Sequence, residues 1–411
     1  MNSTPNFYLN RFSFRKESIQ GAPESDLGIV VVIPCFNETL LSKSIQSLFD
    51  CTKTKCSIEI IIVYNCSEGL DDIRLVNERA MNDVQSKFEW SSRFRIYHLQ
   101  ENSLPKKHAG VGLARKIGMD EAVRRFGMIN NHDGVILCFD ADSVCEASLL
   151  VEVERFFENN KKATGISIHF EHPLEGNEYS KAIYDAIIDY ELHLRYYINV
   201  QRWCGLPYAF QTIGSSMAVR SSVYQKEGGM NRRKAGEDFY FLHKVIALGD
   251  FYDLKSTKTI PSPRQSDRVP FGTGKAVNDI IQSGESLTTY ALQSFVELKE
   301  FINDIPLYYK ANAEFKSEYS PLVISFLNEQ SFESSLEEIN QHSTTIEGFK
   351  KRFYHWFNAF MIMKFAHYSR DNYYSNDDLF VAVNDFFEMN SMIENSSKKE
   401  QLETMRLIDL Q

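Results

Sequence analysis

A run of five apolar residues, Val135 to Phe139, restricts the folds open to this chain more than any other feature. It follows an Asp-Gly turn signal, and a short apolar run of this kind predicts a parallel strand that is buried on both faces. Asp140 and Asp142 come directly after it, at the carboxyl edge of the expected sheet, where open α/β sheets bind their ligands. In extended backbone these two carboxylates point to the same side.

Two carboxylates that face one spot need a cation, a proton or open solvent. Oxygen-only ligands suit Mg²⁺ or Mn²⁺, and a Mg²⁺ ion held by few carboxylates usually completes its shell with substrate phosphates. The Asp-x-Asp pattern therefore favours a divalent metal site with Asp140 and Asp142 as ligands. The alternative is that Asp142 merely begins the next helix, over residues 143–146.

Composition limits the class of protein. The chain of 411 residues is 43% hydrophobic and 24% charged, as expected for a globular protein with one large core or two domains. Its formal net charge of -10 argues against a nucleic-acid partner, because phosphate binding needs concentrated Lys and Arg, although a local basic pocket is still allowed.

The cysteines and the hydropathy pattern indicate a compartment. The seven cysteines are odd in number and include no Cys-x-x-Cys pair, so we expect reduced, buried thiols in a cytoplasmic protein. The first residues do not show the pattern of a signal peptide, and no apolar run approaches the ~18 residues that span a bilayer. We expect no transmembrane segment, and a peripheral membrane contact stays open.

Strand and helix signals alternate from about Gly28 to Ala247. Besides the central run, strand signals lie at residues 28–33, 58–63, 95–99, 165–170 and 214–219. Helical signals lie at residues 41–49, 71–87, 149–157 and 183–197. Two further helices are expected, one that the segment 106–116 enters and that ends at about 126, and one from 237 to a C-cap at 249. This alternation predicts a three-layer α/β fold with a mostly parallel sheet.

The flanking regions differ from this domain. Residues 1–26 are polar and weakly periodic, so we expect an extension that lies on the domain or is partly disordered. Residues 27–277 form the expected α/β domain, and residues 278–411 the expected helical C-terminal region, where strand signals fade. In this last region an aromatic stripe at 353–361 is too large to stay in water, so we expect packing within the chain or in a homodimer.

Several polar residues have two explanations when they are considered one at a time. Asn37 and Glu38, after the first strand, can cap the next helix and favour its dipole. Glu237 and Asp238 can likewise form an acidic first helical turn. Arg115 can reach a phosphate, although the glycines around it match neither a P-loop nor Gly-x-Gly-x-x-Gly.

The order of the motifs resembles the family-two glycosyltransferases of GT-A (Rossmann-like) fold. The matching segments, within about 28–247, are residues 34–38, 59–63, 112–118, 140–142, 229–230 and 237–238. The resemblance implies a transferase that moves a sugar from a nucleoside-diphosphate sugar to a hydroxyl acceptor that the sequence does not identify, with inversion. The alternatives are a sugar-1-phosphate nucleotidyltransferase and a non-catalytic nucleotide-sugar-binding protein.

The resemblance also implies where the nucleotide binds. The residues that would line its pocket follow the first strand: Pro34, Phe36, Asn37 and Glu38. Tyr64 and Asn65 stand where the family usually carries acidic residues that touch the base. This departure leaves the base open, although Asn65 could hydrogen-bond a uracil or guanine edge.

The chemical roles follow from the same resemblance. Asp142 would bind the metal, Asp140 the ribose or the metal, and Arg115 would lie near the diphosphate. Asp238 of the Glu237-Asp238 pair would be the general base. These residue types suit the reaction, because a cation and an arginine stabilise the leaving diphosphate while a carboxylate takes the acceptor proton.

Arg264 and Arg268 lie beyond the shared motifs, in a proline-stiffened loop. With residues 270–274 they could close over the diphosphate as a lid, and the alternative is a solvated loop. The sequence leaves the choice between a monomer and a homodimer open.

Overall fold

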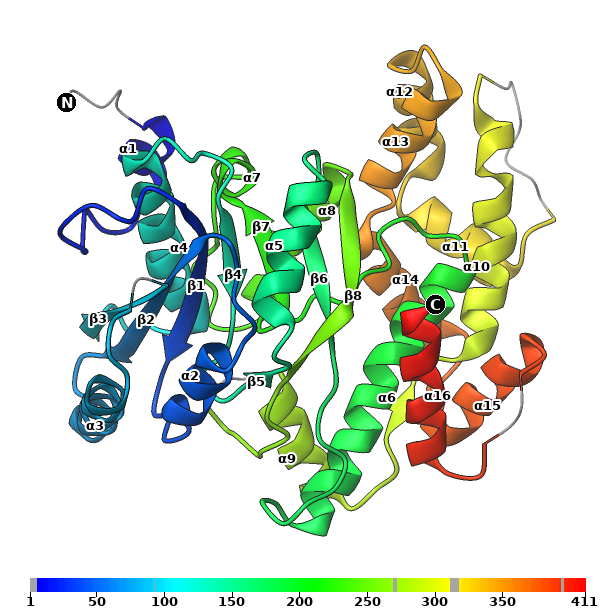
Figure 1. Cartoon of the computed structure of the whole chain (residues 1–411). Coiled ribbons are helices and arrows are strands. Elements are labelled where there is room, and N and C mark those ends of the chain that lie inside the picture. Colours follow the sequence, from blue (N-terminus) through cyan, green and yellow to red (C-terminus); the bar gives the residue numbers. More distant parts are fainter. Residues whose placement is uncertain (1–5, 92, 269–271, 311–317, 393–394) are drawn as a thin grey trace. The chain divides into compact units, whose positions relative to one another are not determined.

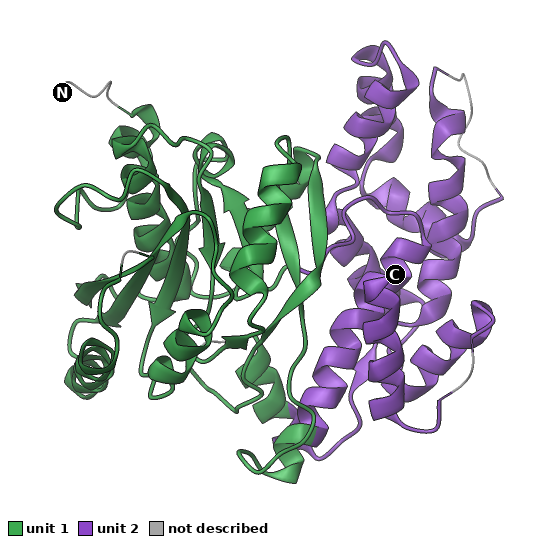
Figure 2. Ribbon diagram, viewed as in Figure 1, with its two compact units in different colours: residues 1–184, 212–279 green, residues 185–211, 280–411 purple. Residues whose placement is uncertain are grey.

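The computed structural model describes residues 6–91, 93–268, 272–310, 318–392 and 395–411 (Figure 1). The chain divides into two compact units (Figure 2). Unit 1 comprises residues 1–184 and 212–279, and unit 2 comprises residues 185–211 and 280–411. The domain boundary expected at residue 277 stays a prediction, but residues 185–211 cluster with the C-terminal residues rather than with those around them in the sequence.

Unit 1 is built on an eight-stranded sheet with the order β3-β2-β1-β4-β7-β6-β8-β5. The strands are β1 (Leu27–Cys35), β2 (Ser57–Ser67), β3 (Phe94–Leu104), β4 (Val135–Cys138), β5 (Val144–Cys145), β6 (Gly165–Phe170), β7 (Met217–Arg220) and β8 (Phe251–Ile260). Neighbours from β3 to β4 are parallel, as are β6 and β8, whereas β7 runs antiparallel to both β4 and β6 and β5 runs antiparallel to β8. The predicted α/β class is confirmed, and the sheet is mixed.

Helices cover both faces of this sheet. They are α1 (Phe7–Phe12), α2 (Leu41–Phe49), α3 (Asp71–Lys87), α4 (Val111–Met128), α5 (Leu149–Asn159), the start of α6 (Lys181–Trp203), α7 (Ser221–Lys226), α8 (Glu237–Ala247) and α9 (Thr273–Ser283). On one face, alternate residues of β1 such as Val31 join a core with Ile45 of α2 and Val84 of α3. On the other, Gly118 of α4 lies so close to the sheet that a Cβ there would be 2.5 Å from Val32 Cγ1. The three layers follow from strands that are apolar on both sides.

Some elements differ from their predicted bounds. β2 continues through Tyr64 and Asn65, beyond the strand signal at 58–63, because these residues still pair with β1 and β3. The helix considered over residues 143–146 is absent, since β5 pairs there with β8. β8 itself was not predicted, and two of its buried positions are the polar residues Thr257 and Thr259.

The described part of the N-terminal extension lies on unit 1. Tyr8 of α1 is buried, and its hydroxyl donates to Asp120 Oδ1 at 2.6 Å. Further along, the Ile19 N–H donates to Glu121 Oε1 at 3.2 Å. Of the two expectations for this segment, the structure supports packing on the domain.

Unit 2 is helical, as predicted for the C-terminal region. Besides most of α6, its elements are β9 (Thr288–Thr289), α10 (Leu292–Asp304), the 3₁₀ helix η1 (Ile305–Tyr308), α11 (Pro321–Glu329), α12 (Phe332–Gln341), α13 (Ile346–Trp356), α14 (Ala359–Asn372), β10 (Asp377–Asp378), α15 (Leu379–Met389) and α16 (Lys398–Leu410). Among the described residues, no helix has both the length and the apolar character needed to cross a membrane.

The aromatic stripe of α13 and α14 packs inside unit 2. Phe353 and Phe357 are fully buried, and both rings lie 6.1 Å from the ring of Phe301 in α10, centroid to centroid. Trp356 lies 5.6 Å from Phe332 of α12. The stripe therefore forms the core of its own unit.

Candidate active site

The carboxyl ends of β1, β2 and β4 and the first turns of α4 and α8 meet at one edge of the unit 1 sheet. Asp140 and Asp142 lie in a tight turn after β4, closed by the hydrogen bond from Ser143 N to Asp140 O at 3.1 Å. Phe139 still donates to Val32 O of β1 at 3.1 Å, so the sheet fixes the position at which the turn begins.

Arg115 of α4 lies at the centre of this edge. Its guanidinium is 3% exposed, donates from Nη2 to Asp140 Oδ1 at 2.6 Å, and forms a short contact from Nη1 to Glu237 Oε1. Gly214 makes room for it, since a Cβ at that position would be 2.4 Å from Nη1. One arginine thus joins the Asp-x-Asp turn to the start of α8.

Close packing buries the start of α8. Gly236 precedes the helix with φ +67°, a backbone conformation that favours glycine. Gly112 lets α4 approach, because a Cβ there would be 2.9 Å from Glu237 Cβ. Glu237 does lie in the first turn of α8, as the structural explanation for it expected, but its side chain is buried and paired with Arg115. Asp238 is half-buried, and its Oδ1 accepts from Phe239 N at 2.8 Å.

The acids around Arg115 bind protons more readily than acids in water. Burial raises the pKa of Asp140 and of Asp238, with the positive charge of Arg115 opposing the shift. Burial likewise raises the pKa of Glu237 to about 7. Although burial disfavours the charge of Arg115, the carboxylates of Asp140 and Glu237 raise its pKa, so it stays a cation. One guanidinium cannot compensate the buried Glu237 and the two half-buried carboxylates of Asp140 and Asp238, which agrees with the direction of all three acid shifts.

Glu38, Asp142, Arg264 and Arg268 form a second cluster at the same edge. Arg264 bridges two carboxylates, donating from Nε to Asp142 Oδ2 at 2.7 Å and from Nη2 to Glu38 Oε2 at 2.5 Å. Arg268 Nη1 donates to the same Glu38 oxygen at 3.0 Å. Both arginines are ion-paired rather than in a solvated loop. Of the lid expected with residues 270–274, residues 270–271 lie outside the described residues, and α9 begins at Thr273.

Glu38 is held in place by the backbone that follows it. The side chain is 3% exposed, and its Oε1 accepts from the N–H groups of Thr39 and Leu40, each at 2.8 Å. The carboxylate therefore caps the turn before α2 and also orients the two arginines. The capping explanation considered for this residue fits these bonds, and its place in a nucleotide pocket stays a prediction.

The expected nucleotide pocket contains an unsatisfied polar group. Asn65 at the end of β2 is buried, and its Oδ1 has no hydrogen-bond partner among the described residues. Asn37 has φ +52°, and its N–H donates to Asn77 Oδ1 at 3.0 Å, while Asn77 Nδ2 donates to Asn65 O at 3.2 Å. Pro34 is buried in β1, and Phe36 follows the strand half-buried.

Asn77 and Gly214 support the site and were not predicted from the sequence. Asn77 lies seven residues, or two helical turns, before the buried Val84 of α3, so both are on the buried face of the helix. A polar residue on that face was the signal in the sequence that could have indicated Asn77. Gly214 was assigned to a strand, whereas it lies in the turn before β7, where its missing side chain leaves space for the guanidinium of Arg115. No local pattern predicts such a contact.

The balance of charge tests whether a metal fits. The carboxylates of the edge are Glu38, Asp140, Asp142, Glu237 and Asp238, and its guanidiniums are those of Arg115, Arg264 and Arg268. With every acid ionised, two negative charges are left over. Asp142 keeps Oδ1 without a hydrogen bond, and the described residues hold no cluster of three or more His, Cys, Asp or Glu side chains that could bind a metal. The surplus negative charge and the carboxylate oxygens of Asp140 and Asp142 would suit a Mg²⁺ or Mn²⁺ ion that takes most of its ligands from a substrate and water, and the metal stays a prediction.

Comparison with known proteins finds a family model that matches part of this edge. The family model described as glycosyl transferase family 2 matches residues 30–225, which contain Asn65, Arg115 and the Asp-x-Asp turn. The match supports the GT-A fold expected for this region and favours a glycosyltransferase over a nucleotidyltransferase. A comparison with curated proteins gives no significant match.

Solved structures give only distant similarities. The Staphylococcus aureus TarS fragment 1–349 in complex with UDP-GlcNAc has a TM-score of 0.40 at 12% identity, covering 93% of this chain and 88% of that one. The same fragment with UDP gives 0.38 at 11% identity, with the same coverage. The longer TarS structure gives 0.38 at 13% identity, with 84% and 54% covered. TM-scores this low carry no argument about function.

Proposed function

Residues 30–225 are a glycosyltransferase family 2 domain, and from this premise we propose that the protein moves a sugar from a nucleoside-diphosphate sugar to an acceptor hydroxyl with inversion. The observation that carries the proposal is the convergence of Asp140, Glu237 and Asp238 on Arg115 at the carboxyl edge of the sheet. These groups come from segments far apart in the sequence, and their pKa values are shifted, as is typical of catalytic sites.

The donor binds along the carboxyl ends of β1, β2 and β4 in this proposal. The unpartnered Asn65 Oδ1 accepts a hydrogen bond from the base, which suits the ring N–H of uracil or guanine. Arg264 and Arg268 turn from Glu38 and Asp142 toward the diphosphate, where guanidiniums bind phosphate oxygens in pairs. Their carboxylate partners hold them close by until the donor arrives.

Asp142 holds the divalent cation, with Asp140 beside it. When bound, a Mg²⁺ or Mn²⁺ ion supplies charge stabilisation to the leaving diphosphate. Asp142 can offer its Oδ1 without losing any hydrogen bond, and its Oδ2 becomes available when Arg264 turns to the phosphates. Asp140 keeps its hydrogen bond from Arg115, and this bond fixes the orientation of its carboxylate toward the metal site.

Asp238 acts as the general base. The acceptor hydroxyl must lose its proton as it attacks the anomeric carbon, and a carboxylate with a raised pKa takes that proton well. Glu237 is the less suitable base, because it is 2% exposed and its carboxylate is engaged by Arg115. We assign Glu237 the role of a positioning residue that fixes Arg115 and the start of α8.

The test is a screen of nucleotide sugars with and without Mn²⁺. A correct donor at a hundred times its Kd stabilises the protein by about 2.7 kcal/mol, so its melting temperature rises. The same donor should release nucleoside diphosphate slowly in water, and NMR of the products should show inversion. Absence of both a thermal shift and diphosphate release across uridine and guanosine sugars would refute the proposal.

A further inference from the structure

Five basic side chains lie exposed on two loops of unit 1. Lys106 and Lys107 precede α4, and Arg232, Arg233 and Lys234 precede α8. We call these five residues the basic edge. Within the described part of the chain, none of them forms an ion pair with a carboxylate. This is unusual for a protein whose formal net charge is -10.

Glycines bring the two loops together, although about 120 residues separate them in the sequence. A Cβ on Gly110 would be 3.0 Å from Lys234 Cα, and a Cβ on Gly112 would be 2.3 Å from Arg233 O. The backbones are therefore in direct contact where α4 and α8 begin. The two exposed basic segments are therefore neighbours in space, and their charges add to one local positive potential.

The basic edge has no evident structural purpose. Arg233 lies over the ring of Tyr240 at 3.6 Å and Arg232 over that of Phe14 at 5.1 Å, contacts that neutral side chains could replace. Neighbouring cations repel one another, and among the described residues no carboxylate forms an ion pair with them. Unpaired cations gathered on one face attract an anion from solution.

The position of the basic edge indicates which ligand it binds. Arg115, Arg264 and Arg268, on the donor side, are each paired with carboxylates, whereas the basic edge is unpaired. Its second loop ends three residues before Glu237, directly ahead of the general base Asp238. The acceptor hydroxyl must approach that base. A cation there is suited to the acceptor rather than to the donor diphosphate.

We propose that the acceptor is a phosphorylated hydroxyl compound and that the basic edge binds its phosphate while Asp238 takes the proton of its hydroxyl. This inference rests on the proposed transferase function for the role of Asp238. The phosphate contact itself can be measured without any donor. Lys and Arg bind phosphate oxygens through charge-assisted hydrogen bonds, which are the strong ones.

The test is calorimetric binding of glycerol 3-phosphate, with glycerol as the neutral control, to the full chain. We expect glycerol 3-phosphate to bind, more weakly as salt is added, and glycerol not to bind. The double variant R233Q/K234Q should bind it about tenfold more weakly or worse, the scale of one lost charged hydrogen bond. The matched control K161Q/K162Q, exposed between α5 and β6, should bind like the unmodified protein.

Three results would overturn the inference. Equal binding by R233Q/K234Q and the unmodified protein, including no binding by either, would show that the basic edge takes no phosphate. Loss of binding in R264Q/R268Q with none in R233Q/K234Q would place the anion in the donor pocket. Binding to phosphatidylserine-rich vesicles without binding of glycerol 3-phosphate would identify a membrane surface instead. Nucleotide-sugar turnover, measured separately, shows whether the transferase proposal has failed.

Discussion

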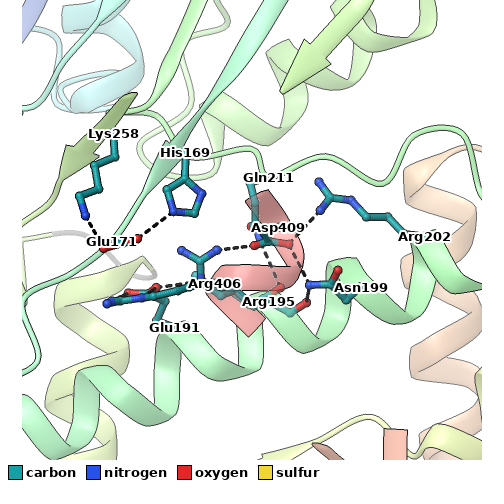
Figure 3. A network of polar contacts seen from close by, with 11 residues as sticks. His169, Glu171, Glu191, Arg195, Asn199, Arg202, Gln211, Lys258, Arg406 and Asp409 are labelled. Atoms are coloured by element: carbon teal, nitrogen blue, oxygen red, sulfur yellow. Dashed lines mark hydrogen bonds and ion pairs between the residues drawn. The ribbon is translucent and has the colours of Figure 1, made fainter. Parts of the chain in front are cut away.

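Each unit of this protein buries a cluster of charged side chains, and the two clusters differ in their balance. In unit 2, α6 and α16 bury Glu191, Arg195 and Asp409, with Arg202 and Arg406 at the margin (Figure 3). In unit 1, Arg115 is shared by Asp140, Glu237 and Asp238. Carboxylates are in the minority in the first cluster and in the majority in the second.

The unit 2 cluster satisfies both of its acids. Both oxygens of Glu191 accept from Arg406 at 2.8 Å, and Oε1 also accepts from Arg195 Nε at 2.8 Å. Asp409 Oδ1 accepts from Asn199 at 3.0 Å and from Arg202 at 2.9 Å, while Oδ2 accepts from Arg195. Such a cluster is complete without a ligand.

The unit 1 cluster does not satisfy its charged groups in this way. Its acids have raised pKa values because burial disfavours their charge and one cation cannot compensate them, and the Nε of Arg115 has no hydrogen-bond partner among the described residues. Desolvated charges cost several kcal/mol each unless something compensates them. The comparison teaches that a buried cluster whose acids are all paired with arginines joins helices, whereas one with surplus acids is a place for a ligand to bind.

The largest effect should follow from removing residues 280–411. This truncation deletes Arg406 and Asp409 while α6, with Glu191 and Arg195, stays. Leaving buried charges without partners is strongly destabilising, and the apolar face of α6 loses its core as well. We expect insoluble or unfolded protein. Circular dichroism and gel filtration of the truncated chain test this, and a soluble, fully active fragment would contradict it.

The next effect concerns the incomplete cluster. Asp142→Asn should abolish metal-dependent binding of nucleoside diphosphate while the fold stays intact, because the amide offers a metal a weaker ligand than a carboxylate. Titration with and without Mn²⁺ measures this, and Asp72→Asn, an exposed acid in the first turn of α3, is the matched control. Undiminished Mn²⁺-dependent affinity in the variant would remove Asp142 from the metal site.

Breaking the unit 2 cluster should destabilise the fold without changing the transfer reaction. Asp409→Asn leaves Arg195 and Arg202 short of a carboxylate, and breaking a buried pair costs about 3–5 kcal/mol. Urea unfolding should show this loss, with no change for Glu403→Gln on the exposed face of α16. A change in donor affinity at temperatures where the variant is folded would count against a purely structural role.

Asp238→Asn should retain donor binding and lose transfer by about a hundredfold or more, the usual effect of removing a positioned base. Single-turnover rates separate the chemical step from binding, with Asp72→Asn again as the control. Near-normal turnover would mean that another group accepts the proton.

The elements that sequence predicted best are those buried on both faces. β1 and β4 are almost purely apolar and β2 has an apolar run at residues 60–63, so composition alone marks them, and the turn at Asp140 and Asp142 follows β4 as expected. β8 escaped prediction because threonines occupy two of its four buried positions, so its apolar residues form no run and no regular alternation. The direction of β7 depends on a chain path that no local pattern records.

The candidate site was predictable as a set of residue types, but not as a geometry. The motif order indicated Arg115, Asp140 and Glu237 separately, yet their contact depends on Gly112 and Gly214, which act only by leaving space. The unit 2 cluster is harder still, since Arg195 and Asp409 lie 214 residues apart in the sequence. The periodicity of α6 predicted an amphipathic helix without indicating which core it joins.

The smallest effect is a pH dependence that distinguishes the two clusters. Burial raises the pKa of Glu237 to about 7, above the 4.5 of an unburied glutamic acid, so between these values the folded state holds a proton that the unfolded state has lost. Stability from this group is therefore full below pH 4.5 and declines as the pH rises toward 7, by about 1–3 kcal/mol.

Glu237→Gln should remove this part of the decline, because the amide does not titrate. The measurement is the free energy of unfolding in urea at several pH values with EDTA present, compared with Glu333→Gln, which removes an exposed acid of α12. Mn²⁺ should also flatten the profile of the unmodified protein, since a divalent cation offsets the surplus of negative charge that raises these pKa values. If Glu237→Gln and Glu333→Gln share one profile, Glu237 is ionised throughout and Arg115 alone compensates it. The surplus of charge would then lie on Asp140 and Asp238, and the same experiment on Asp140→Asn would locate it.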